Sequence, residues 1–236
     1  MEVKDTYYEY NRSDSKYLYI DSKENPIDSL ETALFFLEKR DDNLKWKWVV
    51  LSLHHALYSF SVANLEGSNY REVLTSSYDD DSNIYVKKGN DSWKKSNIVI
   101  TKSPFYKIIW TDVIEPPTNN KKTKKKNKEK LISFPTAIAR VQDGYSWMGR
   151  YIISKPLTLD GLELDAIYKL NYWRNDFTHF IPMGLAVSIN DIRDICRPVL
   201  RIIKFLALKT GQIIYIDNDS EQRIIEVINE LEKRFK

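Results

Sequence analysis

The sequence contains a single cysteine, Cys196, and three histidines, His54, His55 and His179. One cysteine cannot form an internal disulfide or a cysteine metal cluster, and the histidines form no zinc signature with it. We therefore expect a protein of the reducing cytoplasm that holds no metal ion and no cofactor. Cys196 lies within an apolar pattern and is predicted to be a small core residue.

Long apolar runs are also absent. No stretch of about 18 uncharged apolar residues occurs, so we expect no membrane-spanning helix and no membrane partner. The N-terminus lacks the basic and then apolar stretches of a secretory signal. Apolar residues still make up 42% of the 236 residues, and aromatic residues 13%. These proportions exclude global disorder and predict one globular domain over residues 1–236.

The small net charge of +3 is unevenly distributed. Residues 121–130 carry seven lysines and one glutamate, which leaves 29 basic and 32 acidic residues in the rest of the chain. The fold outside this segment is therefore not predicted to be a basic nucleic-acid scaffold. The lysine-rich segment offers nothing to bury, so we expect a mobile loop. It is either a plain solvated loop or a source of non-specific attraction to RNA phosphates.

Apolar residues at helical spacing predict a mainly α protein. Asn25 is expected to cap the first helix, Ser188 to cap the fifth, and Pro198 to kink or break the fifth. Pro182 is expected to stop the fourth helix. The second helix is apolar on opposite sides, which predicts a central position. The expected helices cover residues 25–40, 42–65, 134–143, 159–180, 188–211 and 219–235.

Two parts of the chain lack a helical period. Residues 1–24 are predicted to form an extended arm. Residues 68–133 are predicted to form an insertion that is partly disordered or folded as a β-hairpin. Short β-like runs at 84–86 and 98–100 flank the turn signal at 89–91, which favours the hairpin.

The predicted helix over residues 159–180 concentrates polar functional groups. On a helical wheel Arg174 falls inside the apolar arc, where a charge is costly unless it is paired. Asn175 and His179 stand four residues apart and share one strip with Tyr168 and Tyr172. A guanidinium, an amide and an imidazole are therefore expected beside aromatic rings near the end of this helix.

These groups suit cleavage of RNA. An imidazole can transfer the protons of the 2′-hydroxyl and the 5′-oxygen, and a guanidinium can bind the phosphoryl oxygens. Because the nucleophile is the RNA's own 2′-hydroxyl, no metal ion is needed. One Arg and one His are few for this reaction, and a two-fold homodimer would bring a second pair to the same cleft.

The segment from Arg174 to His179, Arg-Asn-Asp-Phe-Thr-His, resembles the Arg-x(4–6)-His motif of HEPN domains, including the polar residue directly after Arg. Residues 45–58 look like the early core helix of a plasmid-encoded HEPN-like family. The resemblance implies an antiparallel helical bundle and a homodimeric, metal-independent endoribonuclease of toxin–antitoxin or antiviral defence. It implies catalytic roles for Arg174, His179 and Asn175, and an antitoxin or defence-system partner.

One position departs from this pattern. HEPN toxins that are inactivated by nucleotidylation carry a Tyr two residues after the His, and this chain has Ile181 there. Control by that modification is therefore not expected.

Simpler interpretations stay open. Arg174 and His179 can form a salt bridge and a capping group, and Asn175 can cap or bridge within its helix. His54 and His55 are predicted to be hydrogen-bonded core residues. The alternative functions are a non-catalytic HEPN-like RNA-binding scaffold, and a regulatory protein such as an antitoxin or a sensor.

Overall fold

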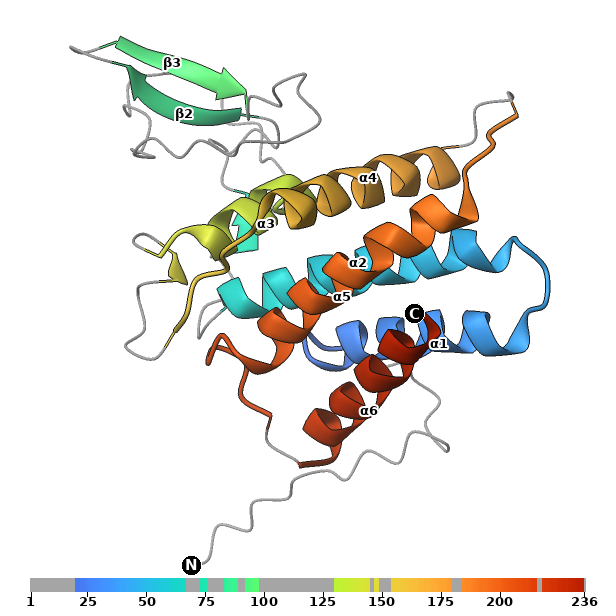
Figure 1. Ribbon diagram of the computed structural model, residues 1–236. Coiled ribbons are helices and arrows are strands. Elements are labelled where there is room, and N and C mark those ends of the chain that lie inside the picture. The colour runs from blue at the N-terminus through green and yellow to red at the C-terminus, as the bar shows by residue number, and fades with distance from the viewer. Residues whose placement is uncertain are drawn as a thin grey trace, which may run out of the picture.

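The computed structural model describes residues 20–66, 73–75, 83–88, 92–97, 130–144, 147–148, 154–179, 184–215 and 218–235. Within these ranges the protein is mainly helical, as predicted (Figure 1). The helices are α1 (Glu24–Lys39), α2 (Lys45–Glu66), α3 (Phe134–Gln142), α4 (Gly161–Thr178), α5 (Ile189–Leu208) and α6 (Asn218–Arg234). None of the helices in these ranges has the length and apolar character needed to span a bilayer.

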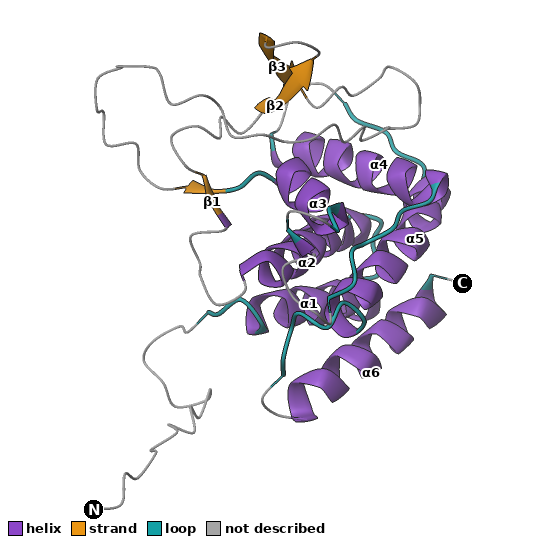
Figure 2. Ribbon diagram, turned by 90° about the vertical axis from the view of Figure 1, so that its left-hand side faces the viewer, coloured by secondary structure: helices purple, strands orange, loops and turns teal. Residues whose placement is uncertain are grey.

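Helix α2 is the centre of the bundle. It packs against α1, α3, α4 and α5, while α6 lies on the outside against α1 and α5 (Figures 1 and 2). The predicted core face of α2 is buried, including Leu53, Leu57 and Phe60. On the opposite face Trp48 stays partly exposed and stacks on Phe36 of α1, with ring centroids 5.3 Å apart. The predicted central position of this helix is thus confirmed.

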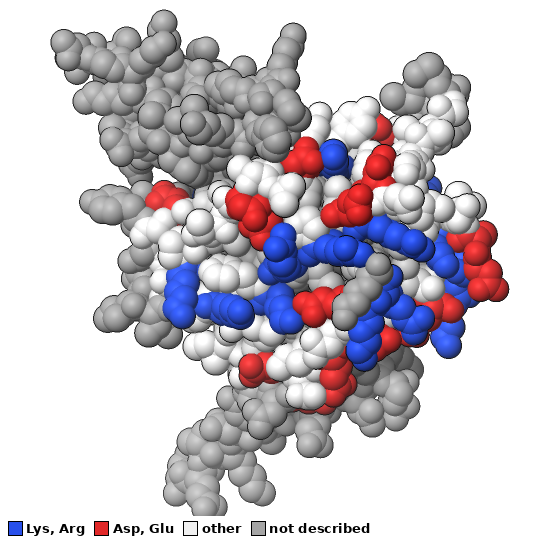
Figure 3. All heavy atoms as spheres, in the orientation of Figure 1, with Lys and Arg blue, Asp and Glu red and all other residues white. Residues whose placement is uncertain are grey.

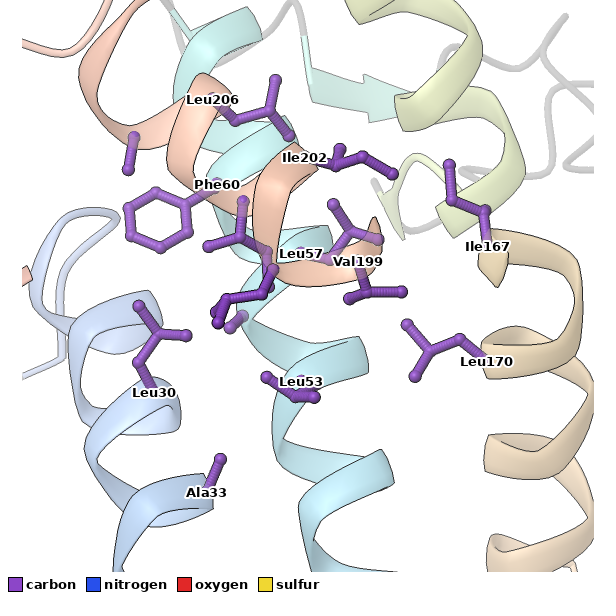
Figure 4. Close-up of a cluster of buried hydrophobic side chains, with 14 of the residues drawn as sticks. Leu30, Ala33, Leu53, Leu57, Phe60, Ile167, Leu170, Val199, Ile202 and Leu206 are labelled. Carbon is purple, nitrogen blue, oxygen red and sulfur yellow. The ribbon is translucent and has the colours of Figure 1, made fainter. Parts of the chain in front are cut away.

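The main core forms where α1, α2, α4 and α5 meet. Figure 4 shows Leu30 of α1, Leu170 of α4 and Leu206 of α5 pointing toward the side chains of α2. Cys196 is fully buried in the same core, as predicted. This packing fixes α4, the helix that carries the predicted site, against α2 and α5.

The start of α1 differs from the prediction. Asn25 does not cap the helix, because α1 begins at Glu24 and Asn25 lies inside its first turn. Oδ1 of Asp21 accepts the backbone N–H groups of Lys23 and Glu24, at 2.8 and 2.7 Å. Pro26 is tolerated there because the first N–H groups of a helix have no partner within it.

Of the kink or break predicted at Pro198, the break does not occur. Helix α5 is continuous from Ile189 to Leu208 with Pro198 inside it. Its cap is as predicted, since the Ser188 side chain accepts the N–H of Asp191. Pro198 and its neighbours Val199 and Leu200 are buried, so their packing outweighs the roughly 3 kcal/mol that an interior proline costs a helix.

The insertion between α2 and α3 contains the predicted hairpin. Strands β2 (Asn83–Lys88) and β3 (Ser92–Asn97) pair in antiparallel register, with Lys88 opposite Ser92. The second strand begins directly after the turn, earlier than the predicted run at 98–100, because a short connection fixes the hairpin register. Residues 98–100 lie outside the described ranges.

A second small ladder joins the ends of the insertion. Strands β1 (Leu74–Thr75) and β4 (Lys130–Leu131) pair, with Leu74 opposite Leu131. Lys130 is therefore part of a strand, and the expected mobile loop of residues 121–130 is wrong at this end. Residues 121–129 and the arm over residues 1–19 lie outside the part of the chain that the structure describes.

Candidate functional site

Helix α4 holds the predicted site between two defined ends. Asp160 caps its start, accepting the N–H of Glu163, while the Glu163 side chain accepts the N–H of Asp160. The last helical residue is Thr178, and His179 is the C-cap, with its N–H donating to the Asn175 carbonyl at 2.8 Å. His179 thus lies among the unpaired carbonyl groups at the end of the helix, a place that attracts positive charge.

Arg174 is half-buried on α4. Its Nη1 donates a hydrogen bond to Oδ1 of Asn175 at 2.8 Å, so Asn175 holds the guanidinium in place. Among the described residues no carboxylate lies within ion-pair distance of Arg174. A partly buried guanidinium without a counter-charge favours binding of an anion.

His54 of α2 faces α4. It is buried, its Nε2 lies 3.1 Å from Oδ1 of Asn171 on α4, and its ring packs on Phe134 of α3 with centroids 4.2 Å apart. Burial lowers the pKa of His54 to about 4, and the charge of Arg174 also lowers it. The hydrogen bond that His54 donates to Asn171 raises the pKa and only partly offsets these effects. His54 is therefore neutral at pH 7. Its prediction as a hydrogen-bonded core residue is confirmed.

His55 is not a core residue, contrary to the prediction. Its side chain is exposed, although the protein around part of the ring lowers its pKa. The carboxylate of Asp28 on α1 opposes that shift, and the charge of Arg174 adds to it. Its Nδ1 lies 2.7 Å from Oγ of Ser29 on α1. His54 faces α3 and α4, whereas His55, about 100° further round α2, contacts α1 at the edge of the bundle.

The charge of Arg174 acts on both histidines of α2, the buried His54 and the exposed His55. His54 in turn contacts Asn171 of α4. Asn171 was not predicted from the sequence. The usable signal was its position three residues before Arg174, which puts both on one side of the helix.

Asn175 and His179 are exposed, on the strip that the wheel predicts. Tyr168 and Tyr172 continue this strip, with ring centroids 6.2 Å apart. Asp176 raises the pKa of the Tyr172 hydroxyl. The His179 side chain makes no hydrogen bond to any residue in the described ranges, so its imidazole is available to a ligand.

Two other surface features lie apart from these residues. Figure 3 shows Lys and Arg side chains crossing the face where α5 lies, and exposed arginines on α5 include Arg197 and Arg201. A cavity of about 550 Å³ between α4 and α5 is lined by Arg201 and Asp165 among others, and by none of the predicted site residues. No group of three His, Cys, Asp or Glu side chains suited to a metal ion occurs in the described ranges.

No protein-family model, no curated protein and no solved structure matches this chain. What the site can do therefore follows from its own geometry and charge.

Proposed function

We propose that this protein is a metal-independent, HEPN-type endoribonuclease that cleaves single-stranded RNA by attack of the 2′-hydroxyl on the adjacent phosphate. The observation that carries this proposal is the half-buried guanidinium of Arg174, which has no carboxylate partner in the described part of the chain. A phosphate group is an anion that a planar guanidinium binds with two hydrogen bonds.

Arg174 binds the phosphoryl oxygens, whose negative charge grows during the reaction. Stabilisation of such charge by a fixed donor contributes roughly 10²–10³ in rate. Asn175 accepts from Nη1 of Arg174 and so orients the guanidinium. This is a positioning role.

His179 transfers a proton to the leaving 5′-oxygen. Its side chain is exposed at the C-cap of α4, so an RNA strand can reach it. The end of the helix favours the positively charged imidazolium that such a donor must be.

The proposal extends to the assembly and setting of the protein. We infer a homodimer whose seam contains α4, working in the cytoplasm within a toxin–antitoxin or antiviral defence system with an antitoxin or defence partner. The support for the dimer is the exposed aromatic strip of α4, and the support for the setting is the resemblance of the motif from Arg174 to His179.

The test is cleavage of single-stranded RNA by the purified protein in EDTA. We expect products that end in 2′,3′-cyclic phosphate, and no cleavage where hydrogen replaces the 2′-hydroxyl at the cut site. His179→Ala should lower the rate roughly 10²–10⁴-fold, and Arg174→Ala roughly 10²–10³-fold. Both variants should keep the circular dichroism spectrum of the wild type.

Lys169→Ala is the matched control, because Lys169 is a cation on the same helix that pairs with Asp165 at 2.9 Å. It should cut RNA at the wild-type rate. A requirement for magnesium, or full activity of His179→Ala, would contradict the proposal. RNA binding without cleavage would favour the non-catalytic scaffold.

A further inference from the structure

A chain of hydrogen bonds on α1 ends at His55. Oγ of Ser29 donates to the Asn25 carbonyl at 2.8 Å, and the same oxygen lies 2.7 Å from Nδ1 of His55. Ser29 is buried, whereas the His55 side chain is exposed. A buried hydroxyl thus ties one edge of the imidazole to α1 and leaves the rest of the ring accessible.

The carbonyl at the far end of this chain determines where the protons lie. A carbonyl oxygen can only accept, and the Ser29 hydroxyl has one hydrogen to donate. Both contacts are hydrogen bonds only when Ser29 donates to Asn25 and Nδ1 of His55 donates to Ser29. In that tautomer Nε2 carries no proton and is free to accept one.

Partial burial of the ring favours this neutral form. The ionisable groups that act on His55 are Asp28 of α1 and Arg174 of α4, with His54 next to it on α2. Partial burial and Arg174 lower the pKa of His55, and together they outweigh Asp28. Near neutral pH His55 is therefore a base on which the charge of the proposed phosphate-binding arginine acts.

We propose that Nε2 of His55 removes the proton of the attacking 2′-hydroxyl and that Ser29 holds the ring in the required tautomer. This role rests on the ribonuclease function proposed above. The 2′-oxygen uses the electron pair of its O–H bond to bond to phosphorus, and the bond from phosphorus to O5′ breaks. O5′ takes a proton from the His179 imidazolium, which gives a 2′,3′-cyclic phosphate and a 5′-hydroxyl. Each chain then carries both a proton acceptor and a proton donor.

The test compares variants on two RNA substrates, one with the natural 5′-oxygen and one with sulfur in its place. Sulfur leaves without a proton, so it makes the proton donor dispensable but not the proton acceptor. His55→Ala should be slowed roughly 10²–10⁴-fold on both substrates. His179→Ala should be slow on the oxygen substrate and restored on the sulfur substrate. Ser29→Ala should be slowed less than His55→Ala.

The pH profile gives a second readout. In the wild type kcat/KM should rise with pH as His55 loses its proton, below its usual pKa of 6.5. This limb should be absent in His55→Ala, or in His55→Gln should the alanine variant not fold.

Ser59→Ala is the matched control. The Ser59 hydroxyl accepts from Nδ2 of Asn25 at 3.2 Å, a similar tie between α1 and α2 one turn away from His55. This variant should cut at the wild-type rate. The role of His55 would be overturned if His55→Ala cut RNA at the wild-type rate, or if the sulfur substrate restored its activity. It would also be overturned if Ser59→Ala lost as much activity as His55→Ala. If wild-type protein leaves RNA intact, the ribonuclease proposal itself fails.

Discussion

At the scale of single residues, His54 is enclosed between Asn171 of α4 and Phe134 of α3, with Arg174 nearby. Its folded-state pKa is about 4, against 6.5 in an unfolded chain. The unfolded state therefore binds more protons between these values. This contribution to stability is complete above pH 6.5 and is lost as the pH falls toward 4.

Acidification from pH 6.5 to 5 should lower the free energy of unfolding by about 2 kcal/mol through His54 alone. His54→Gln keeps a polar group for Asn171 but does not titrate. Urea unfolding of the wild type and the variant at both pH values measures this change in the free energy of unfolding. His55 is present in both proteins, so its contribution cancels in the comparison. Equal pH dependence in the two proteins would mean that His54 is not buried and neutral.

The residues of the site were predictable to different degrees. Arg174, Asn175 and His179 follow from spacing within one helix, which a sequence displays directly. Asn171 and His54 are 117 residues apart in the chain and meet where α4 packs on α2. A pairing of that kind depends on how the helices pack, and no local pattern specifies it.

At the scale of elements, the helices of the described ranges were predictable because apolar residues recur at helical spacing in each of them. The ends of the helices were less predictable. The caps at Asp21 and Asp160 are side-chain contacts to backbone N–H groups, and acidic residues are too common for such contacts to be recognised. Pro198 in α5 shows the reverse, because the packing of the buried residues around it overrides a strong local signal for a helix break.

Asp160→Ala removes the side chain that caps α4 and should lower the free energy of unfolding by about 1 kcal/mol. Asp165→Ala, one turn into the same helix, is the control and should change it by less than about 0.5 kcal/mol, since its pair with Lys169 is at the surface. Chemical denaturation measures both. Equal effects would show that the Asp160 cap contributes nothing of its own.

At the scale of the whole molecule, the exposed strip of α4 predicts a two-chain assembly. Tyr172 is 50% exposed beside Asp176, so Tyr172→Glu would place two carboxylates on the seam. We expect a dimer for the wild type and a monomer for this variant in sedimentation at micromolar concentrations. Ile214→Glu, at an exposed residue outside α4, should stay dimeric. A monomeric wild type at high micromolar concentration would exclude this seam.

We expect the lysine-rich segment to contribute to RNA binding through its charge and not to the stability of the fold. Deleting residues 121–129 spares Lys130, which pairs with Thr75, and should leave the melting temperature unchanged. RNA affinity should fall and its dependence on salt should flatten, because fewer counterions are released on binding. Titrations at several salt concentrations measure this. A large drop in melting temperature would show that the segment is structural.

The pairing of β1 with β4 has a consequence for engineering. Leu74 lies opposite Leu131, so the chain leaves the bundle and returns to it at neighbouring points. A fluorescent protein or a purification tag with closely spaced termini can therefore be grafted between Thr75 and Lys130 without separating α2 from α3. The same junction is a suitable place to split the gene, so that two co-expressed fragments reassemble into one bundle.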